Sequence, residues 1–188
     1  MRLRNIPGAD AAITESVYCI KSPETHKGHW QEIFPSQQPL HIEIGMGKGR
    51  FMMDLAAAHP DINYLGIERY SSVLLRALQK MEENPLPNLF FICMDAADVA
   101  EVFDHGEVDR IYFFNPFSIE ILKKVLARVL ESYYEKPREL LLFFYYPSDE
   151  YISYLMTVDE LIFSDEIDCK DLLPGENKRE RIVVFEVG

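Results

Sequence analysis

The chain has 188 residues, of which 48% are hydrophobic and 27% charged, a composition typical of one globular domain with a sizeable core. Its formal net charge of -12 argues against broad, nonspecific binding of nucleic acids, because such binding needs basic surface that displaces counterions. Residues 1–50 carry six basic and five acidic side chains, and this segment is therefore the least repulsive one for a polyanion.

Residues 1–38 place prolines and glycines between polar residues, and we expect an extension that wraps on the core. From residue 39 onward, apolar runs alternate with segments of helical periodicity. The pattern predicts strands over 40–45, 62–68, 89–95, 108–114 and 139–146, and helices over 50–58, 71–83, 98–103 and 119–134. Two more strand-like segments, 160–169 and 180–187, flank a Pro-Gly loop and predict a hairpin at the edge of the sheet.

The second to fifth predicted strands are almost continuously apolar, as in strands that are buried on both faces. Together with the intervening helices, they predict an α/β fold with a mostly parallel, doubly wound sheet of Rossmann type, which ends in a C-terminal antiparallel hairpin. We expect residues 1–188 to form a single domain.

The three cysteines, Cys19, Cys93 and Cys169, are far apart in the sequence and show neither the spacing of a metal site nor a disulfide framework. This pattern fits the reducing cytosol, and we expect a cytoplasmic protein. No apolar stretch approaches the roughly 18 residues of a membrane span, so no membrane partner is expected. His26 and His29 have no further ligand cluster beside them, and no metal site is predicted.

The first predicted strand runs directly into Gly45-Met46-Gly47-Lys48-Gly49, and a helix follows. Glycines let the backbone turn sharply and approach a ligand, and such folds bind nucleotides in the crevice beyond the carboxyl ends of parallel strands. Alternating glycines are a weak signal by themselves, because a tight turn between a strand and a helix uses the same residues. Their position favours a cofactor-binding loop built on Gly45, Gly47 and Gly49.

An acidic residue stands at or near the end of each of the first three predicted strands. Glu68 follows the glycine loop by about 20 residues, where a carboxylate can accept hydrogen bonds from both hydroxyls of a ribose. Asp95 is placed to accept from an adenine amino group, and Glu43 to face a cationic amino-acid group. Each acid alone is also compatible with a solvated or helix-capping carboxylate. Together they suit S-adenosylmethionine better than the phosphate-rich NAD or ATP.

Residues 1–112 resemble bacterial tRNA (guanine-N7-)-methyltransferases in several long stretches that occur in order. The stretches are MRLRNIPGAD, HKGHWQEIF, HIEIGMGKGRF, HPDINYLGIE, LPNLFFICMDA and GEVDRIY. The resemblance implies a Rossmann-like class I methyltransferase fold, S-adenosylmethionine as the cofactor, and contacts to that cofactor from Glu43, Glu68 and Asp95. It also implies methyl transfer to N7 of guanine in tRNA, a step of tRNA processing.

The resemblance ends after Tyr112. There the family continues with Asn-Phe-x-Asp-Pro-Trp and a dense basic run that holds tRNA, whereas this chain continues with FFNPFS and enters a helix. Residues 113–188 are similar to a different group of class I methyltransferases. We therefore expect a cofactor-binding half over 39–112, an acceptor-side half over 113–188, and a chimera-like join near residues 110–113.

Asn115-Pro116-Phe117 is similar to the Asn/Asp-Pro-Pro-aromatic motif of amino-methylating enzymes, although the second proline is missing. In that motif, the Asn side chain accepts hydrogen bonds from the target amine, and the aromatic ring stacks on the base. The alternative is a strand that proline stops, with Asn115 as the cap of the next helix. We take Asn115 as the candidate catalytic residue near the transferring methyl group. Of the residues that end the fifth strand, Tyr145 is interpreted as core, and the role of Tyr146 is open.

The sequence thus predicts an S-adenosylmethionine-dependent methyltransferase, with guanine N7 of tRNA as the acceptor that the resemblance implies. Two alternatives remain: methyl transfer to another acceptor, and cofactor binding without activity. Both follow from the missing Asp-Pro-Trp and the missing basic run, because tRNA binding needs cationic surface for the phosphate backbone. The net charge of -12 weakens tRNA as a partner in the same way. The sequence does not indicate an oligomeric state.

Overall fold

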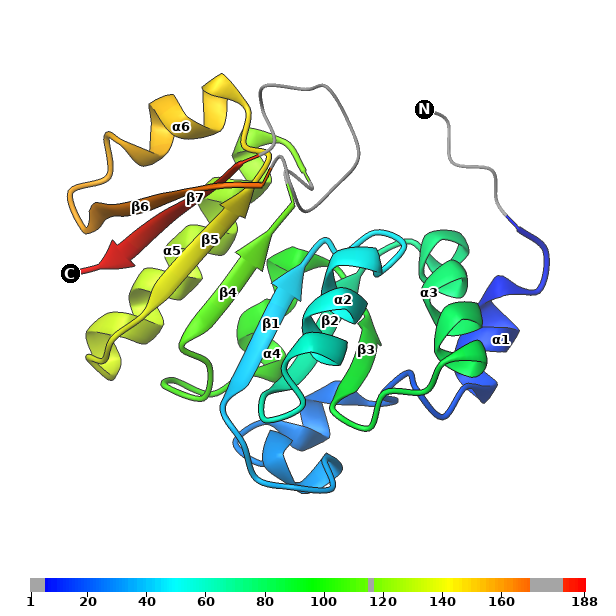
Figure 1. Ribbon diagram of the computed structural model, residues 1–188. Coiled ribbons are helices and arrows are strands. Elements are labelled where there is room, and N and C mark those ends of the chain that lie inside the picture. The colour runs from blue at the N-terminus through cyan, green and yellow to red at the C-terminus, as the bar shows by residue number, and fades with distance from the viewer. Residues whose placement is uncertain (1–5, 115–116, 170–180) are drawn as a thin grey trace.

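The computed structural model describes residues 6–114, 117–169 and 181–188. Its centre is a seven-stranded sheet with the spatial order β3-β2-β1-β4-β5-β7-β6 (Figure 1). The strands are β1 (Leu40–Ile44), β2 (Asn63–Glu68), β3 (Leu89–Cys93), β4 (Arg110–Phe113), β5 (Leu141–Tyr145), β6 (Leu161–Asp168) and β7 (Arg181–Val187).

The five central strands run parallel, and the last two strands are antiparallel. β1 pairs in parallel with β2 and β4, β2 with β3, and β4 with β5. β7 is antiparallel to both β5 and β6, which confirms the predicted hairpin. The final strand takes the inner position because it is the more apolar of the two: most of β7 is buried, whereas β6 exposes every residue after Leu161.

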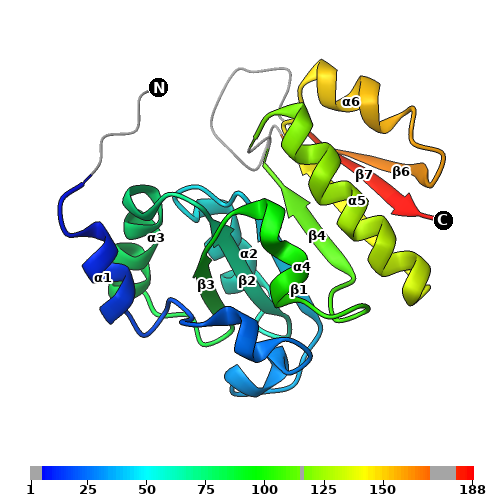
Figure 2. The ribbon, with the colours of Figure 1, turned by 180° about the vertical axis from the view of Figure 1, so that it is seen from behind.

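Helices cover both faces of the sheet, as the doubly wound prediction requires. The helices are α1 (Ala9–Glu15), α2 (Arg50–Ala58), α3 (Ser71–Glu83), α4 (Val99–Val102), α5 (Ile119–Glu135) and α6 (Asp149–Leu155), with 3-10 turns η1 (Pro23–His26), η2 (Trp30–Ile33) and η3 (Ala96–Asp98). α2 and α3 lie on one face, and α4 and α5 cover the other face (Figures 1 and 2). None of the helices described here combines the length and the apolar character of a membrane span.

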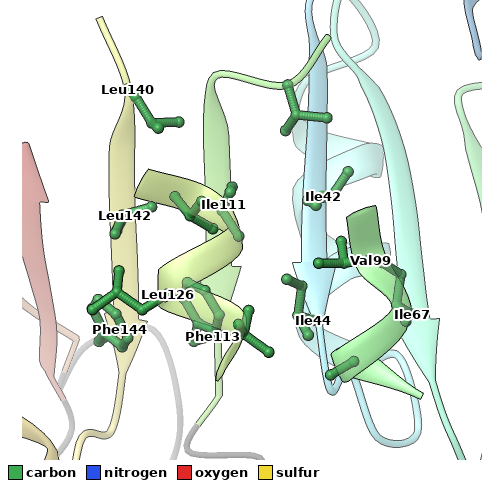
Figure 3. Close-up of a cluster of buried hydrophobic side chains, with 14 of the residues drawn as sticks. Ile42, Ile44, Ile67, Val99, Ile111, Phe113, Leu126, Leu140, Leu142 and Phe144 are labelled. Carbon is green, nitrogen blue, oxygen red and sulfur yellow. The ribbon is translucent and has the colours of Figure 1, made fainter. Parts of the chain in front are cut away.

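The largest core lies between the sheet and α4 and α5. Figure 3 shows Ile42 and Ile44 of β1, Ile111 and Phe113 of β4, and Phe144 of β5 in this core. Phe113 stacks on Phe144 with ring centroids 4.7 Å apart, and Leu126 of α5 packs over the same strands. Alternate residues of β1 and β4 therefore face α4 and α5, and the intervening residues face the side of α2.

A second core holds α2 and α3 against β2 and β3. Met52 and Ala56 of α2 and four residues of α3 pack there with Phe91 of β3. The buried Asn88 fastens the end of α2, because its side-chain amide donates to the carbonyl oxygens of Ala56, His59 and Ile62 at 2.9–3.1 Å. The end of the glycine loop, Gly49, directly precedes α2, so the loop leads into a well-anchored helix.

The N-terminal extension has more structure than the sequence pattern predicts. α1 packs against α3, and Cys19 forms a parallel bridge with Phe91 of β3. Trp30 is fully buried, and its Nε1 donates to the carbonyl oxygen of Val102 at 2.7 Å. The pattern also does not predict α6. Both helices have seven residues and bury only two each, which is too few to set up a visible helical period.

Candidate functional site

The glycine loop joins β1 to α2 at the carboxyl end of the parallel strands (Figure 1). Gly45, Gly47 and Gly49 have φ values of 77°, 59° and 73°, the left-handed region that favours glycine. At Gly49, a Cβ atom would lie 2.9 Å from the Cβ of Ala77 on α3. The amide nitrogens of Gly45 and Met46 donate to the carbonyl oxygen of Ile67. Glycines thus permit both the turn and the close approach of the loop to α3.

Glu68, the last residue of β2, is bonded to the glycine loop. Its carboxylate accepts from the amide nitrogen of Gly47 at 3.0 Å and from that of Tyr70 at 2.9 Å. The residue is only 8% exposed; burial raises the pKa of its carboxyl, and the hydrogen bonds from the backbone oppose that rise. Glu68 therefore orders the loop, and it stands at the strand end where the sequence predicts a ribose contact.

Asp95 follows β3, the strand beside β2, and lines the same small cavity as Glu68. One oxygen of its carboxylate accepts from the amide nitrogen of Ala97 at 3.0 Å, and the other lies 3.1 Å from Nη1 of Arg69. The cavity has a volume of about 230 Å³, and Gly45 and Phe117 also contribute to its wall. Parallel pairing of β2 and β3 thus brings two of the predicted acids to one site.

Glu43 lies one residue before the end of β1 and faces away from the core of Ile42 and Ile44. It is 1% exposed, and among the described residues no hydrogen-bond partner reaches its Oε2 atom. Burial, and to a lesser degree the negative charge of Glu68, raise the pKa of Glu43 to about 8. A buried carboxylate oxygen without a partner is costly. A cationic ligand group beside it would remove that cost.

A second and larger cavity of about 650 Å³ begins at Glu43 and the glycine loop. One flank of α2 forms a wall, because Phe51, Asp54, Leu55 and Ala58 recur three or four residues apart. The full lining is Glu43, Gly45, Met46, Gly47, Lys48, Arg50, Phe51, Asp54, Leu55, Ala58, His59, Phe114, Tyr145 and Cys169. Gly45 lines both cavities, so the two spaces adjoin at the loop's first glycine.

Asn115 lies outside the described residues, so its catalytic role stays a prediction. Its neighbours in the chain bracket the site: Phe114 lines the larger cavity and Phe117 the smaller one. The carbonyl oxygen of Phe117 accepts a hydrogen bond from the hydroxyl of Tyr151. The unpredicted helix α6 therefore holds the start of α5 beside the site.

The sequence pattern does not point to several residues of the larger cavity. In the sequence, Phe51 looks like an ordinary helical residue. Its spacing with Leu55 and Ala58 places the three residues on one flank of α2, and this spacing is the signal that could have indicated the cavity wall. Tyr145 is buried at 4% exposure, as a core residue should be, yet it also lines the cavity. Tyr146 has a φ of 54°, which is uncommon for a residue other than glycine. Backbone strain therefore marks the end of β5.

A comparison with known proteins relates about half of the chain to a family. A family model described as "Putative methyltransferase" matches residues 37–132, a range that contains the glycine loop, the three acids and Asn115. The match also continues through the predicted join at 110–113.

Two curated relatives have the same name, tRNA (guanine-N(7)-)-methyltransferase. The protein of Lachnoclostridium phytofermentans is 54% identical over 112 residues, which are 60% of this chain and 52% of that protein. The protein of Geobacillus sp. strain WCH70 is 51% identical over 113 residues, or 60% and 51% of the two chains. This chain therefore spans about half the length of the curated relatives it matches.

Solved structures show the same fold. The 30S ribosomal A1408 methyltransferase from an uncultured bacterium matches with a TM-score of 0.62 at 15% identity, over 90% of this chain and 96% of that one. At this level of identity the likeness concerns the fold alone.

Proposed function

The chain belongs to this methyltransferase family, and we propose that it uses S-adenosylmethionine to methylate N7 of a guanine in tRNA. The observation that carries the cofactor assignment is the group of acids around the glycine loop. Glu43 is buried with an oxygen that has no described partner, and Glu68 and Asp95 line the adjoining cavity. Such a set suits a ligand with one cationic end and one polar, uncharged end.

The acids of the site fit S-adenosylmethionine, a ligand that carries no phosphate. Glu43 would meet the ammonium group, Glu68 the ribose hydroxyls and Asp95 the adenine side. When bound, the cofactor supplies an electrophilic methyl group on its sulfonium, and the lone pair of N7 takes that methyl as the carbon–sulfur bond breaks. Gly45 and Gly47 add no side chain to the lining of the larger cavity, and Gly49 permits the close approach of the loop to α3.

Guanine N7 has no proton to lose, so the chain does not need a general base for this reaction. Its residues have to position the base and the methyl group, and the rate gained comes from that orientation. We assign this positioning to Asn115 and to the walls of the larger cavity. The division into a cofactor-binding half, 39–112, and an acceptor-side half, 113–188, stays a prediction, because residues of both ranges line the larger cavity.

The names of the curated relatives support tRNA as the acceptor, because the identity over the shared 112 residues is high. A different acceptor is the second candidate. It is favoured by the net charge of -12 and by FFNPFS, which stands where the tRNA enzymes have Asn-Phe-x-Asp-Pro-Trp and leads into a helix instead of a basic run. Separate origins of residues 1–112 and 113–188 would explain both facts. The family model, however, matches across the predicted join, and separate origins therefore stay a hypothesis.

Transfer of a labelled methyl group tests the acceptor. The protein is incubated with labelled S-adenosylmethionine and either total tRNA or a panel of small-molecule acceptors. Label recovered as 7-methylguanine supports the proposal, and label on another acceptor supports the second candidate. Cofactor binding without any transfer would contradict both.

Calorimetry tests the cofactor site separately. Glu68→Ala is expected to lose at least ten-fold in affinity for S-adenosylmethionine, because it removes the proposed ribose contact and an anchor of Gly47. Glu82→Ala, on the exposed side of α3, is the matched control. Unfolding curves of both variants show whether the Glu68 variant is folded, and unchanged affinity in a folded variant would overturn the assignment.

A further inference from the structure

Three aromatic rings from distant parts of the sequence meet in the wall of the larger cavity. Phe51 comes from α2, Phe114 follows β4, and Tyr145 ends β5. Phe51 and Tyr145 are stacked, with centroids 5.4 Å apart and planes 7° from parallel. Phe114 lies 4.7 Å from Tyr145 at 38°. The fold thus builds one aromatic cluster beside the glycine loop.

The exposure of these rings differs in a way that matters for binding. Tyr145 is 4% exposed, whereas Phe114 is 42% exposed. A large apolar ring that is open to solvent beside a cavity, and supported from behind by a buried ring, offers a flat face at little cost in side-chain entropy. The cofactor contacts proposed above use the acids at the ends of β1, β2 and β3, and they leave this face unused.

The polar groups of the cavity indicate what kind of flat group would fit. Asp54 supplies carboxylate oxygens within the lining, while Lys48 and Arg50 are exposed members of the same lining. Carboxylates can accept from ring and exocyclic N–H groups, and exposed cations suit a phosphate attached to the ring. An aliphatic acceptor would make no use of three clustered aromatic rings.

We propose that this cluster is the acceptor subsite, and that it binds a flipped-out nucleobase by stacking on Phe114. The inference rests on the proposed function, because it concerns the acceptor of the same methyl transfer. Enzymes that act on a base take it out of its stack and hold it between aromatic or apolar side chains. At about 650 Å³, the larger cavity is within the size range of sites that enclose a whole small ligand.

A tryptophan placed at the subsite tests the stacking directly. Phe114→Trp adds a fluorophore to a chain whose only other tryptophan, Trp30, is fully buried. Guanosine, adenosine, cytidine and uridine monophosphates are titrated into this variant with S-adenosylhomocysteine present. Saturable quenching by at least one nucleotide, and none by ribose 5-phosphate, is expected.

Phe163→Trp is the matched control, because Phe163 is 49% exposed on β6 and is not part of either cavity at the site. It should show no saturable quenching. Absence of saturable quenching by all four nucleotides in Phe114→Trp, or equal quenching in both variants, would overturn the stacking proposal.

Kinetics separate this proposal from the proposed function. Phe114→Ala should raise the KM for the nucleic-acid acceptor roughly ten-fold, the size of effect expected when a stacking ring is truncated, and Phe114→Tyr should restore it. The affinity for S-adenosylmethionine should not change in either variant. Methylation of tRNA that is insensitive to Phe114→Ala would overturn the subsite and leave the function standing. Nucleotide stacking on Phe114→Trp without methyl transfer to tRNA would support the subsite and overturn the proposed function.

Discussion

Replacing Glu43 by Gln should make the free protein more stable and the cofactor bind more weakly. Glutamine keeps the shape of the side chain but cannot carry a charge. Glu43 is 1% exposed, its Oε2 has no partner among the described residues, and its pKa is raised from an ordinary 4.5 to about 8. The native state therefore holds the proton of Glu43 more tightly than the unfolded chain does.

The sign and size follow from linkage. Below pH 4.5 the carboxyl of Glu43 is protonated in both the native and the unfolded state, so it does not change the free energy of unfolding. As the pH rises from 4.5 toward 8, the unfolded chain releases this proton and the native state keeps it, and the free energy of unfolding falls. The loss amounts to about 1.4 kcal/mol for each pH unit in that window. Between pH 4.5 and pH 7 it reaches about 3 kcal/mol for the native side chain. In Glu43→Gln this loss is absent.

Urea unfolding of the cofactor-free protein at pH 5, 6, 7 and 8 measures the effect. The stability of Glu43→Gln relative to the wild type should increase across the series, and Glu82→Gln should run parallel to the wild type. Calorimetry in buffers of different ionisation enthalpy should show that cofactor binding at pH 7 releases a proton from the wild type but not from Glu43→Gln. Parallel stability curves for the wild type and Glu43→Gln would refute the reasoning.

Three further substitutions test the supports of the site. Gly49→Ala should lower the melting temperature more than Gly8→Ala. Both glycines have a positive φ, but a Cβ atom at Gly49 would lie 2.9 Å from the Cβ of Ala77, whereas at Gly8 it would meet nothing within 4 Å. Equal shifts of the melting temperature would contradict the steric argument. Asn88→Ala should lower the free energy of unfolding in urea by about 2 kcal/mol, since three carbonyl oxygens, one of them in a buried hydrogen bond, lose their donor. Asn88→Asp should not recover this loss. Trp30→Phe should lower the free energy of unfolding by roughly 1–3 kcal/mol, because the carbonyl oxygen of Val102 stays buried and loses the donor Nε1. Unfolding followed by circular dichroism measures this change, and wild-type stability would contradict it.

Hydrophobic patterning was enough to predict the main architecture. The runs of β1 to β5 are short, apolar and separated by helical periodicity, and parallel strands of this kind have to be covered on both faces. The predicted strands agree with the observed ones except at their ends, where Val108 and Tyr146 lie outside β4 and β5. The end positions differ because pairing partners, rather than local apolarity, decide where a ladder stops.

The candidate site was predicted only where it depends on strand ends. Parallel strands bring their carboxyl ends to one edge, so acids at the ends of β1, β2 and β3 must lie near the glycine loop. The sequence could not show that Glu68 would bond to Gly47, or that Glu43 would have an oxygen without a partner. Those facts depend on distances between elements that no local pattern contains.

By itself, the sequence determined the alternation of strands and helices, the glycine loop, and the three acids at or near the ends of the first three strands. These features depend on local conformational preference and on periods of two or of about 3.6 residues. Only the tertiary structure decided that β7 lies inside β6, that α6 holds Phe117, and that Phe51, Phe114 and Tyr145 meet in one cavity. Contacts of this kind join residues tens of positions apart, and they are set by how the layers pack.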